Sequence, residues 1–238
     1  MKTLRDVILM NDKSVSWDFI DIFLIYIASL LFGTSLFVDL AHAILPEPRG
    51  PMLEFSINVV CQYGSFILFM TIILLWRGAS WKEVGLRPSS WSAVKRYGIG
   101  GGLLLAVSIS FLGVILAWLR PDLEGQYFSQ VLNDISSWSH ILITFLSGVV
   151  IGPVVEELFF RGMVYPLMRK YCGVIWGIVA TGVMFGLSHF DLWRALPLAL
   201  GGMGLCYIYE KTDSIWPPII AHGLWNGIMY LFVILPLL

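Results

Sequence analysis

Residues 141–168 read ILITFLSGVVIGPVVEELFFRGMVYPLM. This run exceeds the roughly 20 apolar residues that cross a bilayer as a helix, yet its centre holds Glu156, Glu157 and Arg161. An ionisable side chain in the bilayer core costs at least about 2.5–3.5 kcal/mol on insertion scales. The stretch therefore predicts a membrane-spanning helix whose charges have a partner or a chemical role.

The composition of the whole chain is that of a membrane protein. Of the 238 residues, 58% are hydrophobic and 13% are charged, and the mean hydropathy is +0.80. Soluble domains have about 45–50% apolar and about 25% charged residues. A soluble enzyme, a nucleic-acid binder and a disordered chain are thereby excluded. We predict an all-α polytopic membrane protein, one membrane domain over residues 1–238, in contact with the lipid bilayer and with no nucleic acid.

Apolar runs predict a bundle of about seven transmembrane helices, within a range of six to eight, around a polar intramembrane cavity. They fall at residues 19–40, 55–76, 98–119, 141–168, 173–189, 195–209 and 216–238. Lys and Arg gather before the first run and in alternate joints. Because basic residues favour the cytoplasmic side, we expect a cytoplasmic N-terminus.

Helical spacing assigns different tasks to the three charges of the fourth run. Glu157 and Arg161 are four residues apart with the acid first, which favours an ion pair. Glu156 points about 100° away from Glu157, so it is free for chemistry. The alternative is that all three charges form one buried network that fixes helix packing.

Two later runs carry imidazoles. His189 ends the fifth run, four residues after Phe185, and such a histidine is often only a hydrogen-bonded residue at a helix end. His222 and Asn226 lie four residues apart in the last run and so share one helix face. Two costly polar groups on one face favour a functional site there.

Together these groups could hydrolyse an amide bond. A carboxylate activates water, an amide or imidazole holds the oxyanion, and an imidazole protonates the leaving nitrogen. Glu156, His189, His222 and Asn226 would supply these groups. Glu156, His189 and His222 could also hold zinc with a water in the fourth position, although asparagine is a poor zinc ligand. The cofactor is therefore unknown, and a zinc-dependent and a metal-free mechanism both stay open.

The motifs Glu-Glu-x-x-x-Arg, Phe-x-x-x-His and His-x-x-x-Asn occur in this order on successive apolar helices. This order resembles the CAAX-protease and bacteriocin-processing family, also called CPBP or Abi, of bacterial type. The resemblance covers roughly residues 140–230 and implies a catalytic core at 141–230. It implies that Glu156 is the water-activating base, and that His189, His222 and Asn226 complete the catalytic set. Glu157, Arg161 and Phe185 would support the site or contact the substrate.

The family resemblance implies an intramembrane endopeptidase, of glutamate type or a metalloprotease, in a bacterial cell membrane. Its substrate would be a membrane-associated protein or peptide, such as a CAAX-like, leader or signalling peptide. A further membrane protein is a possible partner. The alternative is a noncatalytic membrane scaffold or immunity partner that uses the same fold. A proton-coupled transporter is less well supported, because no repeated half is visible.

One geometric conflict accompanies the prediction of seven spans. If every run simply crosses the bilayer, His189 lies near the outer end of the fifth helix and His222 near the inner end of the seventh. One site then cannot hold both. We therefore expect a tilted, broken or re-entrant span, and a cavity formed by the last four spans.

Overall fold

A computed structural model describes residues 15–123, 131–132 and 135–237, and every regular element within these residues is helical. Five helical segments are long and apolar enough to cross a membrane, by length and composition. They are Phe19–Ile44, Pro51–Trp76, Trp91–Leu119, Trp138–Leu187 and Trp216–Ile234. The predicted helical membrane bundle is confirmed, and about seven spans are compatible with it.

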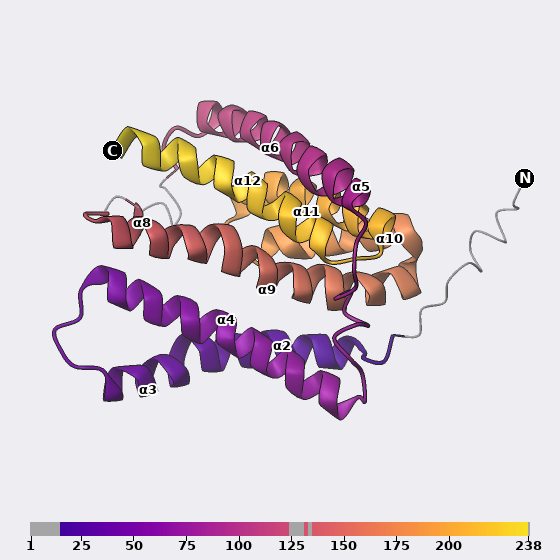
Figure 1. Cartoon of the computed structure of the whole chain (residues 1–238), viewed down its shortest axis with the longest axis horizontal. Helices are drawn as coiled ribbons and strands as arrows, with labels where there is room; N and C mark the ends of the chain where they lie inside the picture. Colours follow the sequence, from indigo (N-terminus) through magenta and orange to yellow (C-terminus); the bar gives the residue numbers. More distant parts are fainter. Residues whose placement is uncertain (1–14, 124–130, 133–134, 238) are drawn as a thin grey trace, which may run out of the picture.

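The helices form two groups (Figure 1). The first group contains α2 (Phe19–Leu31), η1 (Phe32–Leu36), α3 (Phe37–Ile44) and α4 (Pro51–Trp76). The second contains α5 (Trp91–Ala93), η2 (Val94–Ile99), α6 (Gly100–Leu119), α8 (Trp138–Phe145), η3 (Leu146–Ile151), α9 (Gly152–Phe159), η4 (Phe160–Val164), α10 (Tyr165–Leu187), α11 (Leu192–Thr212), α12 (Trp216–Ile234) and the terminal turn η5 (Leu235–Leu237).

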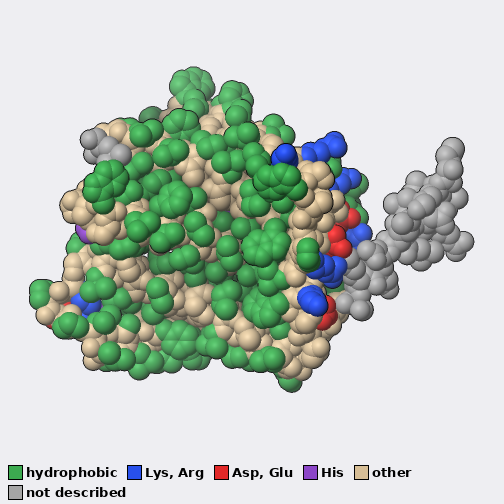
Figure 2. All heavy atoms as spheres, in the orientation of Figure 1, with side chains coloured by type: hydrophobic (Ala, Val, Ile, Leu, Met, Phe, Trp, Pro, Cys, Tyr) green, Lys and Arg blue, Asp and Glu red, His purple; other side chains and the backbone are tan. Residues whose placement is uncertain are grey.

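Apolar side chains cover the outside of the bundle. Figure 2 shows hydrophobic side chains over most of the visible face, while Lys and Arg gather mainly at one end. Phe23, Val107 and Trp118 are 61%, 70% and 80% exposed. Exposed apolar area on this scale is stable against lipid rather than water. The chain is an integral membrane protein.

Side chains of the first group anchor it to the second. The indole Nε1 of Trp17, just before α2, donates to the carbonyl of Met163 in η4 at 2.9 Å. The ring of Tyr26 stacks on that of Phe159, with ring centroids 6.1 Å apart. These contacts hold α2 against the helix that carries the acidic pair.

Gly173 breaks the segment Trp138–Leu187 into two arms. Its φ of 75° lies in the left-handed region, which glycine adopts without steric cost. At 1.5 Å per residue, residues 138–172 extend about 50 Å and residues 174–187 only about 20 Å. The hydrocarbon core is about 30 Å thick, so an arm of this length that enters from one membrane face ends inside it, and we expect His189 at membrane depth. This short arm resolves the conflict between His189 and His222.

Small residues let the second arm pack closely on α11. A Cβ built on Gly186 would lie 2.3 Å from the carbonyl oxygen of Ala195, and one on Gly182 would lie 2.8 Å from that of Ala199. The spacing of four residues between these glycines predicts close helix packing in lipid, and the structure confirms it here. The close approach fixes the position of the helix end that carries His189.

Candidate active site

The helix α9 is flanked by two π-helical segments, η3 and η4. Pro153, near the start of α9, has no N–H to donate to the carbonyl four residues earlier, that of Val149. A Cβ built on Gly223 would lie 2.8 Å from that Val149 oxygen, so glycine allows α12 to approach it. The wider π turns change the directions in which the following side chains point. Such π-helical turns are frequent at functional sites. They set the directions of the acidic pair on α9.

Glu157 lies at the centre of a buried polar network. Its Oε1 accepts from Arg161 Nη1 at 2.8 Å and lies 2.8 Å from His222 Nδ1. Arg161 Nη2 also donates to the carbonyl of Gly202 in α11 at 3.0 Å. The side chains of Glu157 and Arg161 are both 0% exposed. The predicted ion pair is confirmed, and it joins α9, η4, α11 and α12.

Phe185 packs in the middle of the site rather than on its surface. Its ring centroid lies 4.6 Å from the Arg161 guanidinium carbon, 5.0 Å from the His189 ring and 5.7 Å from the His222 ring. The side chain is fully buried. Its position therefore favours the supporting role over the substrate contact that the sequence left open.

His222 lies between the two glutamates. Its Nδ1 contacts Glu157, and its Nε2 lies 3.9 Å from Glu156 Oε2, which is too long for a hydrogen bond. The ring stacks on Trp225, with centroids 5.4 Å apart. When Nδ1 carries a proton for Glu157, Nε2 faces Glu156 either with a lone pair or, in the protonated ring, with a second N–H.

Glu156 faces a pocket of about 330 Å³ instead of the buried network. The pocket is lined by Tyr26, Leu30, Thr34, Gln62, Tyr63, Phe66, Val155, Glu156, Phe159, Phe160, Ser188 and His189. Helices α2, η1 and α4 therefore supply half of the wall. The prediction of a cavity built by the last four spans is wrong, because α2 and α4 pack directly on α9.

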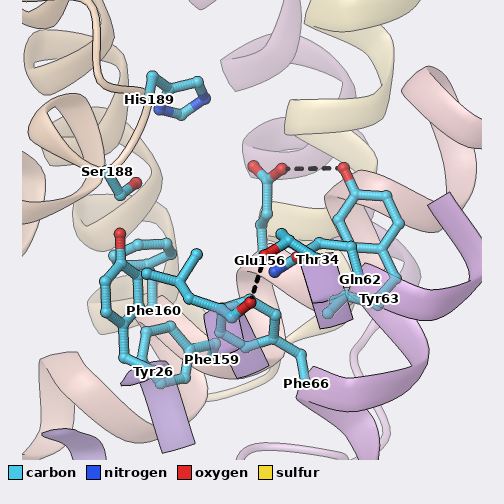
Figure 3. Close-up of a pocket in the computed structure, with 12 residues that line it drawn as sticks. Tyr26, Thr34, Gln62, Tyr63, Phe66, Glu156, Phe159, Phe160, Ser188 and His189 are labelled. Atoms are coloured by element: carbon cyan, nitrogen blue, oxygen red, sulfur yellow. Dashed lines mark hydrogen bonds between the residues drawn. The ribbon is translucent and has the colours of Figure 1, made fainter. Parts of the chain in front are cut away.

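Tyr63 of α4 contacts Glu156 in the pocket. Its hydroxyl donates to Glu156 Oε1 at 3.4 Å, as the dashed line in Figure 3 shows. A Cβ built on Gly152, one turn before Glu156, would lie 2.8 Å from this hydroxyl. The glycine therefore makes room for the tyrosine. Sequence reasoning missed Tyr63, because no motif surrounds it.

His189 borders the same pocket from the end of α10. Its Nδ1 lies 2.9 Å from the carbonyl of Phe185. Because a carbonyl only accepts, this contact places a proton on Nδ1 and leaves Nε2 available to another partner. In the view of Figure 3, Glu156 lies between Tyr63 and His189. The structure thus brings Glu156 and His189, two residues selected from the sequence, to one pocket.

Asn226 lies away from the pocket lining. Its Nδ2 donates to the carbonyl of Gly148 in η3 at 2.9 Å. The π-helical turn leaves this carbonyl accessible to a side chain from α12. The predicted convergence of four side chains is therefore only partial: Glu156 and His189 line the pocket, His222 lies behind Glu156, and Asn226 ties α12 to η3.

The metal set suggested by the sequence was Glu156, His189 and His222. Among the residues that the structure describes, no three His, Cys, Asp or Glu side chains are grouped so that they could hold a metal ion. His189 lines the pocket, whereas His222 lies behind Glu156 and outside the pocket lining. The arrangement does not fit a three-ligand metal site, so no step below passes through a metal.

The fold and the site define an integral membrane protein with a carboxylate and an imidazole on one pocket at membrane depth. Residues 138–228 match the family model described as type II CAAX prenyl endopeptidase Rce1-like. The predicted resemblance is thereby confirmed for this part of the chain.

Curated bacterial relatives agree with the family match. The chain is 24% identical over 180 residues to YdiL of Bacillus subtilis, named as a membrane peptidase, covering 72% of this chain and 70% of YdiL. It is 32% identical over 155 residues to the membrane-embedded CAAX protease MroQ of Staphylococcus aureus, covering 59% of this chain and 60% of MroQ. The aligned part is thus less than two thirds of MroQ. No solved structure matches the chain.

Proposed function

We propose that the protein is an intramembrane endopeptidase that hydrolyses a peptide bond with a water molecule activated by Glu156. The observation that carries the proposal is the position of Glu156. Its carboxylate lines a largely apolar pocket that His189 also lines. The family match and the names of the relatives support a membrane endopeptidase of CAAX-protease type.

The reaction begins when Glu156 takes a proton from water as the water oxygen attacks the scissile carbonyl carbon. The carbonyl oxygen becomes an oxyanion on a tetrahedral carbon. When this intermediate collapses, the carbon–nitrogen bond breaks, and the nitrogen receives the proton from Glu156 directly or through His189. The products are a carboxylic acid and an amine, and the acid then passes its remaining proton to the amine or to water. Because most of the exposed lining of the pocket is apolar, electrostatic contacts inside it are stronger than in water.

His222 and the buried ion pair position the base in this mechanism. Glu157 holds His222 by Nδ1, so that Nε2 stays near Glu156. Arg161 balances the charge of Glu157 inside the protein. We assign Glu157, Arg161 and Phe185 to support of the site. Asn226 acts with them by fixing α12, and residues 141–230 stay our proposal for the catalytic core.

We infer that the substrate is a membrane-associated protein or peptide, of the CAAX-like, leader or signalling kind. A site at membrane depth is reached most directly by a segment that is already in the bilayer. We further propose that the protein lies in a bacterial cell membrane with its N-terminus in the cytoplasm. The gathering of Lys and Arg at one end of the bundle supports this orientation (Figure 2).

The experiment that tests the function compares the newly formed protein termini in membranes of cells that express the wild-type chain or Glu156→Gln. The matched control is Asp39→Asn, which changes an exposed carboxylate on α3 in the same isosteric way. We expect termini that occur with the wild type and the control and are absent with Glu156→Gln. Identical sets of termini in all three would favour the noncatalytic scaffold.

A further inference from the structure

We propose that the hydroxyl of Tyr63, on α4, stabilises the oxyanion that forms when water attacks the substrate carbonyl. The inference rests on the proposed peptidase function and adds a catalytic residue from outside residues 138–228, which match the family model. It gives the first helical group a chemical role in the site.

An oxyanion needs a hydrogen-bond donor that is already aimed at the place where the charge develops. Asn226 does not line the pocket, and its Nδ2 donates to Gly148. Two hydroxyls of the pocket lining are also engaged with the backbone. Thr34 Oγ1 donates to the carbonyl of Leu30 at 2.6 Å, and Ser188 Oγ donates to that of Phe185 at 2.8 Å.

Tyr63 differs from these hydroxyls because its O–H is directed at the proposed base. The separation of 3.4 Å between its oxygen and Glu156 Oε1 is longer than the 2.5–3.0 Å typical of O–H···O bonds. The O–H of Tyr63 therefore loses only a weak hydrogen bond to Glu156 when it turns toward the oxyanion. A carbonyl that is attacked by water held on Glu156 lies next to this carboxylate, which is the group that the Tyr63 hydroxyl already contacts.

Transfer of a proton from water to Glu156 favours a switch of the Tyr63 O–H from Glu156 to the oxyanion. While Glu156 is ionised, its carboxylate is a charged acceptor for Tyr63. After Glu156 has taken the proton from water, the carboxyl is neutral and the oxyanion is the charged acceptor. Because hydrogen bonds to charged groups are about twice as strong as neutral ones, the O–H of Tyr63 then favours the oxyanion. The donor is therefore released in the step that needs it.

The test uses Tyr63→Phe, which removes the hydroxyl and keeps the ring. The matched control is Tyr165→Phe, which also removes a tyrosine–glutamate hydrogen bond, the 2.8 Å contact of Tyr165 with Glu210 outside the pocket. The assay uses the purified full chain and a quenched fluorescent peptide with a cleavage sequence found in the cell comparison. We expect kcat to fall about 10²–10³-fold in Tyr63→Phe, as for loss of one oxyanion donor. KM should stay within about twofold, and the control should keep both constants.

A phosphinate analogue of the same peptide separates this role from a structural one, because it mimics the tetrahedral intermediate. The phosphinate should bind Tyr63→Phe more weakly than the wild type, by about the factor by which kcat falls. The cleaved product peptide should bind both proteins equally well. If Tyr63→Phe does not fold, Gly152→Ala provides the second variant, because its Cβ would displace the hydroxyl. Its kcat should then fall at least about tenfold.

Unchanged kcat in the folded variant would overturn the role of Tyr63, as would a lower kcat with undiminished affinity for the phosphinate. Either result leaves the peptidase function standing, provided that the wild type cleaves the peptide and Glu156→Gln does not. Absence of cleavage by the wild type would instead count against the proposed function itself.

Discussion

Glu156 and Glu157 are consecutive residues of α9, yet they have opposite environments. The side chain of Glu156 is 25% exposed and borders the pocket, whereas that of Glu157 is 0% exposed and bonded to Arg161. Adjacent positions on a helix point about 100° apart, which places one carboxylate on each side of the helix. This division separates the group proposed for chemistry from the group that holds the helices together.

Replacing Glu157 by glutamine should destabilise the protein more than the same change at Glu156. Glu157→Gln leaves the fully buried Arg161 without a balancing charge, which typically costs about 3–5 kcal/mol. Among the described residues, Glu156 has no ion-pair partner within hydrogen-bond distance, so Glu156→Gln should change stability little. Thermal unfolding of both variants in the same detergent measures the difference. Equal midpoints would contradict the assigned roles.

Replacing His222 should impair turnover through the position of Glu156. We expect kcat to fall by about 10²-fold in His222→Gln, because small displacements of a catalytic group cost that much. The matched control is His42→Gln, which removes another imidazole–glutamate contact, the 2.8 Å pair of His42 with Glu54, neither of which lines the pocket. Peptide cleavage rates give the comparison. Full activity of His222→Gln would show that the imidazole does not act on the base.

The close contact of α10 with α11 should make Gly186 intolerant of a side chain. Gly186→Ala would place a Cβ 2.3 Å from the carbonyl of Ala195, and overpacking of this kind costs about 1–3 kcal/mol. Gly113→Ala in α6 is the control, because nothing lies within 4 Å of the added atom. We expect a lower unfolding midpoint only for Gly186→Ala. A similar midpoint for both would argue against the close packing.

Chelation distinguishes the two mechanisms that the sequence left open. Within the described residues Glu156, His189 and His222 are not grouped as a metal site, and a glutamate mechanism needs only Glu156 and water. We therefore expect cleavage to continue after exhaustive treatment with a strong chelator and dialysis, with metal content measured in parallel. Loss of cleavage that zinc restores would contradict the metal-free mechanism.

Spacing within single helices made part of the site predictable. The interval of four residues between Glu157 and Arg161 is sufficient to predict their ion pair, because such residues share a helix face. The order of the three motifs also indicated the family, which the match at residues 138–228 confirms. Both features depend on residues that are close together in the sequence. A single sequence predicts such local features best.

Contacts between distant helices were not predictable in the same way. Tyr63 lies in an apolar run like many other tyrosines, and only the packing of α4 on α9 brings it to Glu156. Asn226 shares a helix face with His222, as predicted, but its amide donates to Gly148, a carbonyl in the π-helical segment η3. No periodicity in the sequence marks that segment. The position of Gly173 likewise sets the depth of His189 through a backbone break.

Cleavage of a purified peptide by Glu156→Gln is the sharpest test of whether Glu156 is the general base. The variant keeps the size of the side chain and loses the charge that takes a proton from water, and general-base catalysis contributes typically about 10²–10⁴-fold. With protein of the same unfolding midpoint as the wild type, we predict that kcat falls by at least about 10²-fold. Cleavage at the wild-type rate would contradict the role of Glu156 as the base that activates water.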